Sequence, residues 1–551
     1  MKVLAASIGN CVHVSGVQAF LDIARSLGHE TVFLGPAVSI QSLIAAAKEL
    51  KPDVVAVSYR LSAESARPLL DEFRSQVTGS PELSRLRYLF GGTPPVVELA
   101  RATGIFGACF DGTESRSAVV DALTGKSPSS TPVRHAEDLV SRIAASSFPL
   151  IRHHFGQPSL EKTIEGAAHI AESGLLDILS IAPDQNAQES FFRPDEMDRK
   201  LDGAGGVPVR GPEDLRALYA ATRRGNHPLL RCYSGTRELI KWAEMLKDTI
   251  KVAWGAVPLT WYSELDGRSK RSLMEAITEN QAAIRWYSEN GVPVEVNESH
   301  QWALRRSGDV IEVATAYIAA YNAKALGVRD YVCQFMFDTP RGISPAMDLG
   351  KMLAKVDLIQ PLASDKFRII RMVRSGLSSF SPDPNIAKGQ LASSVYSSMA
   401  IGPQIVHVVG FSEGDHAATA DEVIESCAIA RGAIMRAMLG KPEVSADPKI
   451  AARRTQLVEE TRLLVESIRR LRNGGKGDSL TSPHVLAEAV QEGLLDAADL
   501  RGSKVARGRI LTEIVEGACV ALNPVTRLPL PEKDRIQALA VSDKDLDLSE
   551  M

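Results

Sequence analysis

The sequence predicts two α/β units in one chain, a doubly wound parallel sheet followed by a (β/α)8 barrel with a C-terminal cap. Three observations lead to this prediction. The 551 residues exceed the length of one ordinary domain. Short apolar runs alternate with amphipathic segments, which is typical of parallel sheets, and one Ser- and Pro-rich segment interrupts the alternation. We expect a first domain over residues 1–124, a linker over 125–146, a barrel over 147–474 and a cap region over 475–551.

The first 124 residues contain the patterns of a complete five-stranded domain. The expected strands are KVLAASIG, TVFLG, DVVAVSY, RYLFGG and FGACFDG, and helical segments such as VQAFLDIARSLGH and SIQSLIAAAKEL separate them. We interpret the apolar N-terminus as the first strand, because residues 9–13 are polar and no cleavage site follows. The carboxyl ends of parallel strands meet at one edge of the sheet, where open α/β sheets bind ligands.

The linker GKSPSSTPVR concentrates Ser and Pro between two well-patterned stretches. Beyond it, helical patterns follow seven further strand candidates, LLDILSIA, PLLRCY, IKVAWGAV, VPVEVN, DYVCQFM, FRIIRMV and IVHVVGF. Seven or eight such units in about 330 residues favour a TIM barrel over an open sheet.

Composition excludes several classes of protein. Lys and Arg number 63 against 67 Asp and Glu, with no basic stripe that would follow a phosphate backbone, so we expect no nucleic-acid partner. The six cysteines are dispersed without metal-binding spacing, which indicates free thiols in a reducing cytoplasm. No run approaches the ~18 to 20 apolar residues of a membrane helix, so we expect no membrane partner.

Candidate ligand-binding residues follow four of the expected strands. They are Asn10, Cys11, His13 and Gly16 after the first strand, Ser58 and Arg60 after the third, Gly91 and Gly92 at the fourth, and Gly112 and Thr113 after the fifth. A neutral imidazole such as that of His13 is a good ligand for a late first-row metal. Glycines lack a Cβ and so let the backbone approach a ligand closely.

This arrangement resembles the cobalamin-binding domain shared by cobalamin-dependent mutases and methionine synthase, whose signature is Asp-x-His-x-x-Gly, then Ser-x-Leu, then Gly-Gly. The resemblance covers residues 1 to 124 and implies a Rossmann-like fold, cobalamin as the cofactor, and all ten residues above as its binding residues. It also implies that His13 is the lower axial ligand of cobalt and that the freed nucleotide tail enters a slot between sheet and helix.

The sequence departs from this signature at two places. Cys11 stands where the family has the aspartate that hydrogen-bonds the imidazole, and Ser-x-Leu reads Ser58-Tyr59-Arg60. Losing such a partner commonly costs ~10 to 100-fold in metal affinity or activity. The alternative is a generic flavodoxin-like domain in which His13 is a polar loop residue. Candidate binding residues at the carboxyl ends of four strands favour the cobalamin site.

The remaining residues resemble, distantly, the catalytic barrel subunit of glutamate mutase (methylaspartate mutase), best in SGLLDILSIAPD, DGAGGVPVRGPEDLRAL and PLLRCYSGT. Three arginines of that enzyme clamp the two substrate carboxylates, a task that suits guanidinium forks. The resemblance retains Arg231 and places His154 and Gln188 at the other two positions, so these three are candidate substrate-binding residues.

Two further barrel residues are candidate catalytic residues by the same resemblance. Trp254 falls near the family glutamate that accepts the substrate ammonium, and Glu298 matches another carboxylate that projects from a strand. Structural roles are the alternatives, namely an ion pair for Arg231, a core position for Trp254 and a capping or ion-paired role for Glu298. His300, His407 and His416 lack metal-site spacing.

The two resemblances together imply an adenosylcobalamin-dependent radical carbon-skeleton mutase, an isomerase with both glutamate-mutase-like subunits fused. Its substrate would be a small carboxylate other than glutamate, and the family implies a homodimer. Two alternatives stay open, a corrinoid-dependent methyltransferase and a non-catalytic cobalamin-binding protein.

Overall fold

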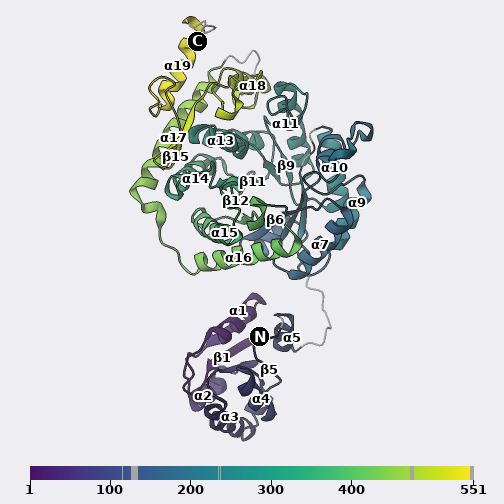
Figure 1. The fold of residues 1–551 in the computed structure, drawn as a ribbon, viewed down its shortest axis with the longest axis vertical. Helices are drawn as coiled ribbons and strands as arrows, with labels where there is room; N and C mark the ends of the chain where they lie inside the picture. Colours follow the sequence, from purple (N-terminus) through teal and green to yellow (C-terminus); the bar gives the residue numbers. More distant parts are fainter. Residues whose placement is uncertain (115, 126–134, 234, 236, 472–476, 546–551) are drawn as a thin grey trace. The chain divides into compact units, whose positions relative to one another are not determined.

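The computed structural model divides the chain into two compact units, Met1–Arg134 and His135–Met551. It describes residues 1–114, 116–125, 135–233, 235, 237–471 and 477–545 (Figure 1). Residues 126–134 of the predicted linker and the predicted barrel–cap boundary at residues 474 and 475 lie outside the described residues. Residues 135–146, also predicted as linker, belong instead to the second unit and contain a helix over Leu139–Ala145.

The first unit is a five-stranded parallel sheet with the strand order β2-β1-β3-β4-β5. Its strands are β1 Lys2–Ser7, β2 Glu30–Phe33, β3 Val54–Tyr59, β4 Arg87–Gly92 and β5 Ala108–Phe110. Its helices are α1 Ser15–Ser26, α2 Ile40–Leu50, α3 Ala63–Thr78, α4 Pro94–Ala102 and α5 Arg116–Thr124. The order reverses between β1 and β3, the point at which doubly wound sheets bind ligands, and the predicted fold of this unit is confirmed.

Local sequence explains where these helices begin. Ser39 and Ser62 precede α2 and α3 and accept hydrogen bonds from the backbone N–H groups of Ser42 and Ser65, which satisfies helix donors that have no partner inside the helix. Strand β3 is buried along its whole length, as expected for a parallel strand covered by helices on both faces.

The second unit contains eight parallel strands in the order β8-β7-β6-β13-β12-β11-β10-β9. They are β6 Leu150–Phe155, β7 Ile178–Ile181, β8 Leu229–Cys232, β9 Gly255–Val257, β10 Val294–Val296, β11 Asp330–Phe337, β12 Arg368–Ser375 and β13 Ile405–His407. The N–H of Ala253, before β9, donates to the carbonyl of Leu230 in β8 at 2.8 Å, so the two ends of the sheet meet. Helices surround these strands (Figure 1), and the predicted (β/α)8 barrel is confirmed.

Strand β6 is the one that the sequence patterns did not reveal. Its sequence LIRHHF carries three polar residues, and it lies between β13 and β7. Arg152 and His153 of this strand are nonetheless almost fully buried. Arg152 and His154 face a polar barrel interior, and they therefore interrupt the apolar run by which a buried strand is usually found.

The barrel helices begin with α6 and end with α16. Their bounds are α6 Leu139–Ala145, α7 Leu160–Ser173, α8 Gln185–Ser190, α9 Pro212–Ala221, α10 Leu239–Ile250, α11 Leu273–Glu289, α12 Ser299–Leu304, α13 Asp309–Ala325, α14 Pro345–Ile359, α15 Pro384–Ser398 and α16 Ala420–Met438. The C-terminal elements are α17 Pro448–Arg469, α18 Pro483–Gln491, the hairpin β14 Thr512–Val515 with β15 Ala518–Ala521, and α19 Glu532–Asp545. Among the described residues, no helix is both long and apolar enough to cross a membrane.

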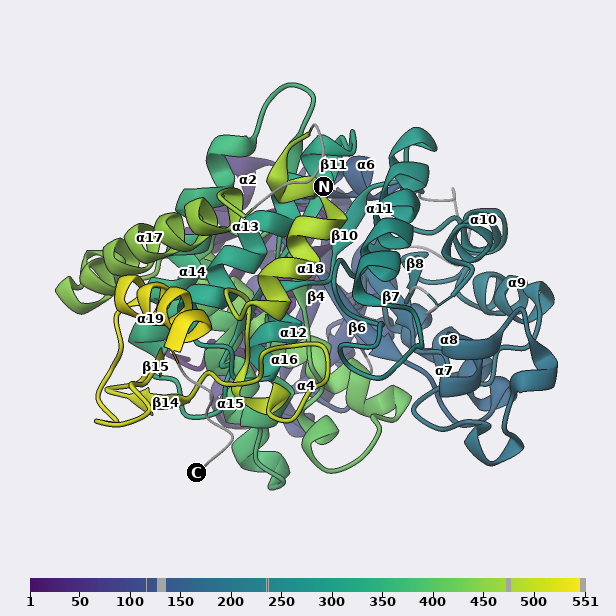
Figure 2. The same ribbon diagram turned by 90° about the horizontal axis from the view of Figure 1, so that it is seen from above.

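The C-terminal elements share their core with the barrel. Leu480, Leu486 and Val490 belong to the same buried apolar cluster as residues of the barrel strands and helices. Helix α17 lies along α13 and α14, and α18 packs on α11 (Figure 2). The predicted cap is therefore continuous with the hydrophobic core of the second unit.

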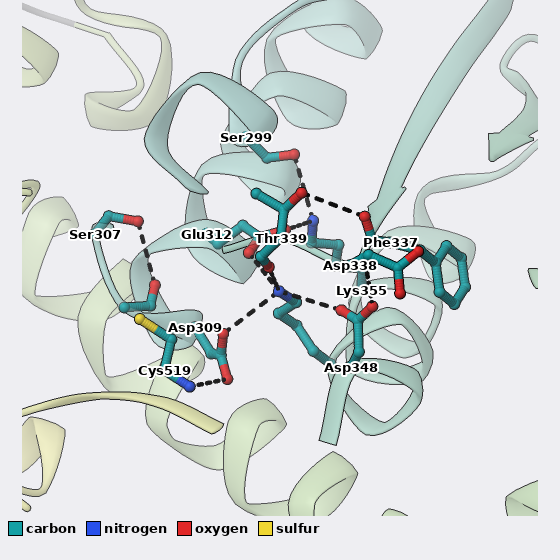
Figure 3. Close-up of polar contacts among 12 residues, drawn as sticks. Ser299, Ser307, Asp309, Glu312, Phe337, Asp338, Thr339, Asp348, Lys355 and Cys519 are labelled. Carbon is teal, nitrogen blue, oxygen red and sulfur yellow. Dashed lines mark hydrogen bonds and ion pairs between the residues drawn. The ribbon is translucent and has the colours of Figure 1, made fainter. Parts of the chain in front are cut away.

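Helices α13 and α14 also pack through buried charges (Figure 3). We call Asp309, Glu312, Asp348, Lys351 and Lys355 the lysine network. Lys351 Nζ lies 2.8 Å from a Glu312 oxygen and donates to the carbonyl of Thr339 at 2.6 Å, while Lys355 Nζ binds the other Glu312 oxygen. Asp309 accepts from Arg453 of α17 and from the backbone N–H of Cys519 in β15, so the network joins the barrel to the C-terminal elements.

Candidate functional site

A cavity of about 270 Å³ opens in the first unit between α1, the carboxyl ends of β3 and β4, and the turn after β5. Its lining includes six of the ten residues predicted to bind the cofactor, namely Gly16, Ser58, Arg60, Gly91, Gly92 and Gly112. Most of its accessible surface is apolar. The cavity thus forms a slot between the sheet and α1, toward the carboxyl edge at which open α/β sheets bind ligands.

The glycines of this slot differ in the space around the position where a Cβ would lie. A Cβ added at Gly16, Gly91 or Gly112 would meet no described atom within 4 Å, so these three leave space that side chains would otherwise fill. A Cβ at Gly92 would lie 2.6 Å from the carbonyl oxygen of Tyr59, so this glycine is required by the packing of β4 against β3. Gly16, Gly91 and Gly112 form the kind of cradle that an extended ligand can fill.

His13 is exposed in the loop between β1 and α1. The Sγ atom of the buried Cys11 lies 3.9 Å from His13 Nδ1 and also accepts the backbone N–H of Arg60 at 3.3 Å. Cys11 therefore contacts the nitrogen that the family's aspartate holds, and Nε2 is the nitrogen left for a metal ligand bond. His13, with Nδ1 in contact with Cys11, fits the cobalt of the corrin. The slot, whose glycines leave its walls without side chains, fits the nucleotide part of cobalamin.

The other two predicted cofactor residues lie in neighbouring turns. Asn10 Oδ1 accepts a hydrogen bond from the hydroxyl of Tyr59 at 2.9 Å. The hydroxyl and backbone N–H of Thr113 both donate to Asp111, which lowers the pKa of that carboxyl. Asn10 and Thr113 thus stabilise the loops at the rim of the sheet in this structure.

The interior of the barrel changes from apolar to polar along its axis. An apolar layer contains Leu150, Ile178, Leu229, Ala256, Val332, Ile370, Met372 and Ile405. Two residues further along four of these strands, on the same inward face, stand Arg152, Ser180, Arg231 and His407. We call the polar set the barrel polar cluster; it comprises Arg152, His154, Ser180, Arg231, Tyr233, Trp254, Glu295, Gln334, Arg374 and His407.

Glu295 of β10 is the carboxylate at the centre of this cluster. Its Oε2 accepts from Trp254 Nε1 at 2.7 Å and from Arg231 Nη2 at 3.2 Å, and lies 3.8 Å from Arg152 Nη1. Glu295, Arg231 and Arg152 are each 1% exposed or less. One carboxylate therefore faces two buried guanidinium groups.

Several buried polar atoms of the cluster have no hydrogen-bond partner among the described residues. They are Arg231 Nε and Nη1, Glu295 Oε1, Gln334 Nε2 and His407 Nδ1. Buried polar atoms are normally satisfied, so a group of orphans on facing strands indicates that a polar ligand completes them. Arg152 is different, because its three nitrogens already contact Ser180, Met372 and His154.

The electrostatics of the cluster favour an anion. Burial, reinforced by the charge of Arg231, lowers the pKa of Arg152 to about 9, so Arg152 stays charged at neutral pH. Burial and the charges of Arg152 and Arg374 hold the pKa values of His154 and His407 well below the ordinary range, so both imidazoles are neutral. Three arginines then face one carboxylate in this part of the barrel.

The structure brings three of the five predicted barrel residues together. Arg231, Trp254 and His154 all belong to the barrel polar cluster. Gln188 lies in α8, where its Nε2 donates to the carbonyl of Pro183 at 2.8 Å. Glu298 lies after β10, outside the cluster.

The carboxylate of Glu298 is held by four hydrogen bonds. It accepts the backbone N–H groups of Leu259 and Thr260, the hydroxyl of Thr260 and the indole N–H of Trp302. Burial raises its pKa. These contacts fasten the loop after β9 to α12, although the Glu298 side chain does not cap that helix as the structural alternative expected.

Sequence reasoning missed Arg152, Glu295 and His407 as candidate site residues. Each could have been found from the two-residue period of a barrel strand, since Arg152 precedes His154 by two and Glu295 alternates with Val294 and Val296. In an amphipathic strand such a polar residue is read as facing solvent, but in a barrel it faces the interior.

Comparison with known proteins assigns the first unit. Residues 1–120 match the B12 binding domain family, so this unit is a B12-binding domain and the chain is a cobalamin-binding protein that also carries a barrel. A search of curated proteins found no match.

Two solved structures are similar to parts of the chain. A novel cobalamin-binding protein from Desulfitobacterium hafniense DCB-2 is 20% identical, with 22% of this chain and 58% of that chain covered and a TM-score of 0.20. The chain thus spans less than two thirds of that protein. Yersinia pestis DHPS, solved with a pterine-sulfa conjugate, is 12% identical, with 53% of this chain and 94% of that chain covered and a TM-score of 0.31.

Proposed function

We propose that the chain is an adenosylcobalamin-dependent radical carbon-skeleton mutase, an isomerase that acts on a small carboxylate other than glutamate. The observation that carries the proposal is the state of Arg231. Its side chain is fully buried, and Nε and Nη1 have no hydrogen-bond partner among the described residues. Nε–H and the N–H groups of Nη1 lie on opposite edges of the guanidinium, and each can donate a charge-assisted hydrogen bond to an oxygen of an anionic substrate.

The residues of the first unit fit the cofactor. His13 would ligate cobalt through Nε2, and the slot walled by Gly16, Gly91 and Gly112 would take the nucleotide tail. Adenosylcobalamin, when bound, supplies an organic radical by homolysis of its cobalt–carbon bond.

The barrel residues bind and orient the substrate. Arg231 holds its carboxylate, and Glu295 fixes the Arg231 guanidinium by accepting from Nη2. Trp254 and the apolar layer below the cluster exclude water, which strengthens every charge interaction there. The contacts of Arg152 with Ser180, Met372 and His154 leave Arg231 as the main anchor, which favours one carboxylate over the two of glutamate.

Spectroscopy on the purified full-length chain tests this function. Under anaerobic conditions we expect added adenosylcobalamin to give the spectrum of a histidine-ligated corrinoid. Addition of the correct member of a panel of two- to five-carbon carboxylates is expected to produce the EPR signal of an organic radical coupled to cobalt. His13→Ala should lose the ligation, and Arg231→Gln should keep it but lose the radical signal.

Other outcomes select other functions. Transfer of a methyl group from methylcobalamin to an acceptor, without any radical signal, would replace the mutase by a corrinoid-dependent methyltransferase. Corrinoid binding with neither reaction would leave a non-catalytic cobalamin-binding protein. Failure to bind any corrinoid would contradict the proposal altogether.

A further inference from the structure

A chain of hydrogen bonds crosses from β6 to β13 inside the barrel. Arg152 Nη2 and His154 Nε2 are 3.0 Å apart, and His154 Nδ1 and His407 Nε2 are also 3.0 Å apart. The two strands are neighbours, and Arg152 is paired in register with His407. The far nitrogen of the chain, His407 Nδ1, is buried and has no partner among the described residues.

The donor at the start of the chain fixes every proton in it. A guanidinium can only donate, so His154 Nε2 must accept and the proton of neutral His154 resides on Nδ1. His154 Nδ1–H then donates to His407 Nε2, so the proton of neutral His407 resides on Nδ1. The orphan atom is therefore an N–H donor rather than an acceptor.

The surroundings hold both imidazoles neutral and in place. His407 is paired in register with Arg374 of β12 and with Arg152 of β6. Because both neighbouring strands place an arginine beside it, protonation of the neutral His407 imidazole is disfavoured. The ring of His154 stacks on Tyr233 with centroids 5.0 Å apart, and the Arg231 guanidinium lies 4.6 Å above the same Tyr233 ring. These contacts connect the His407 donor to the Arg231 carboxylate anchor within one cluster.

We propose that His407 is a specificity-determining residue whose Nδ1–H selects a substrate with a second acceptor oxygen, a hydroxy- or oxo-carboxylate, beside the carboxylate that Arg231 binds. Arg152 and His154 are positioning residues, because they act only by fixing the His407 tautomer. A buried donor left unpaired costs free energy, so the site discriminates against a carboxylate that lacks the oxygen. This inference rests on the proposed function, since it takes the barrel polar cluster as the substrate site.

Three anions of equal chain length test the inference on the full-length chain. Propanoate offers only a carboxylate, lactate adds a hydroxyl and pyruvate adds a carbonyl oxygen. We expect isothermal titration calorimetry to show that lactate, pyruvate or both bind about tenfold or more tightly than propanoate, as one buried hydrogen bond allows. Calorimetry needs neither the cofactor nor turnover.

Two variants separate the two nitrogens of His407. In His407→Asn the amide falls where Nδ1 lies and can still donate, whereas in His407→Gln it falls where Nε2 lies and keeps only the contact with His154. Discrimination against propanoate should fall at least fivefold in His407→Gln and be largely retained in His407→Asn. Circular dichroism and melting temperature confirm that both variants fold.

The possible results separate this inference from the proposed function. Equal binding of all three anions by the native chain, or full discrimination in His407→Gln, overturns the role of His407 and leaves the carboxylate anchor intact. If none of the three anions binds, the substrate site of the proposed function fails together with the inference. Binding of all three that survives in Arg231→Gln also counts against both.

Discussion

The Cys11 thiol stands beside His13 where the cobalamin-binding signature has an aspartate. A thiol 3.9 Å from Nδ1 is a weak partner compared with a carboxylate, which would fix the tautomer and raise the basicity of the imidazole. Cys11 is also fully buried and accepts the N–H of Arg60, so the position is already suited to an acceptor. The native residue is therefore expected to weaken histidine ligation of cobalt.

Cys11→Asp is expected to strengthen cobalamin binding by roughly 10 to 100-fold, the range that such partners commonly contribute. Titration of the full-length chain with methylcobalamin, followed by visible absorption, measures the change. Cys11→Ser is the matched control, since it replaces the sulfur by an uncharged hydroxyl oxygen and should alter the affinity for cobalamin little. An affinity that is equal in the aspartate and serine variants would contradict the importance of the missing carboxylate.

Gly91 and Gly92 are adjacent in the sequence and should respond differently to substitution. A Cβ added at Gly91, in the lining of the slot, meets no described atom within 4 Å, so Gly91→Val is expected to lower cobalamin affinity at least tenfold with the melting temperature unchanged. A Cβ at Gly92 strikes the carbonyl of Tyr59, so Gly92→Ala is expected to lower the melting temperature by several degrees.

Calorimetric melting of the cofactor-free chain and cobalamin titration together test this pair. Unaltered cobalamin binding in Gly91→Val would show that the slot does not take the cofactor. A Gly92→Ala variant as stable as the native chain would show that β3 and β4 can separate to admit the methyl group.

At the scale of the elements, the sequence predicted most strands but not the arrangement of the barrel site. The five strands of the first unit and seven of the barrel follow the apolar pattern of buried parallel strands. Strand β6 broke that pattern, because Arg152 and His154 face inward. Proximity across strands, such as that of Arg152 to Glu295, depends on the barrel's closure and stagger, which no local spacing encodes.

The lysine network fastens α13, α14 and the C-terminal elements together. Lys351→Met leaves Glu312, Asp309 and Asp348 without their shared cation, and breaking a buried ion pair from one side costs about 3–5 kcal/mol. We expect a clearly lower melting temperature of the second unit by differential scanning calorimetry. Lys441→Met, on the exposed surface, is the control and should change stability little. An unchanged Lys351→Met variant would mean that the apolar packing alone holds these helices.

Asp348 gives the second unit a dependence of stability on pH. Burial raises its pKa from 3.8 to about 7, so the folded chain keeps a proton that the unfolded chain loses above pH 4. Its stabilising contribution is full below pH 3.8 and is lost as pH rises through 7, with a slope of at most about 1.4 kcal/mol per pH unit. Asp348→Asn keeps the side-chain shape without the titration.

We therefore expect the melting temperature of Asp348→Asn to rise relative to that of the native chain as the pH increases from 4.5 to 7.5. Scanning calorimetry at four or five pH values measures this trend. A constant difference across the range would show that Asp348 is ionised throughout, with Lys351 compensating for its burial.

At the scale of the whole molecule, each unit has its own hydrophobic core. The sheet of the first unit has an apolar cluster on each face, one containing Leu4, Val55 and Phe73 and the other containing Val3, Leu21 and Leu89. A domain of this length buries enough surface to fold alone, at about two thirds of the surface of its unfolded chain. The second unit contains a complete barrel with the elements that close its outer face.

The cofactor and substrate functions should therefore separate when the chain is divided. A fragment of residues 1–125 contains His13, Cys11 and all the walls of the slot, so we expect it to fold and to bind cobalamin within about fivefold of the affinity of the full chain, because no interaction of the described slot is lost. A fragment of residues 135–551 should fold, bind no corrinoid and bind small carboxylates as the full chain does. Circular dichroism and calorimetric titration of both fragments test this division. If the first fragment folds but binds cobalamin more than a hundredfold less tightly, the second unit must contribute contacts to the cofactor.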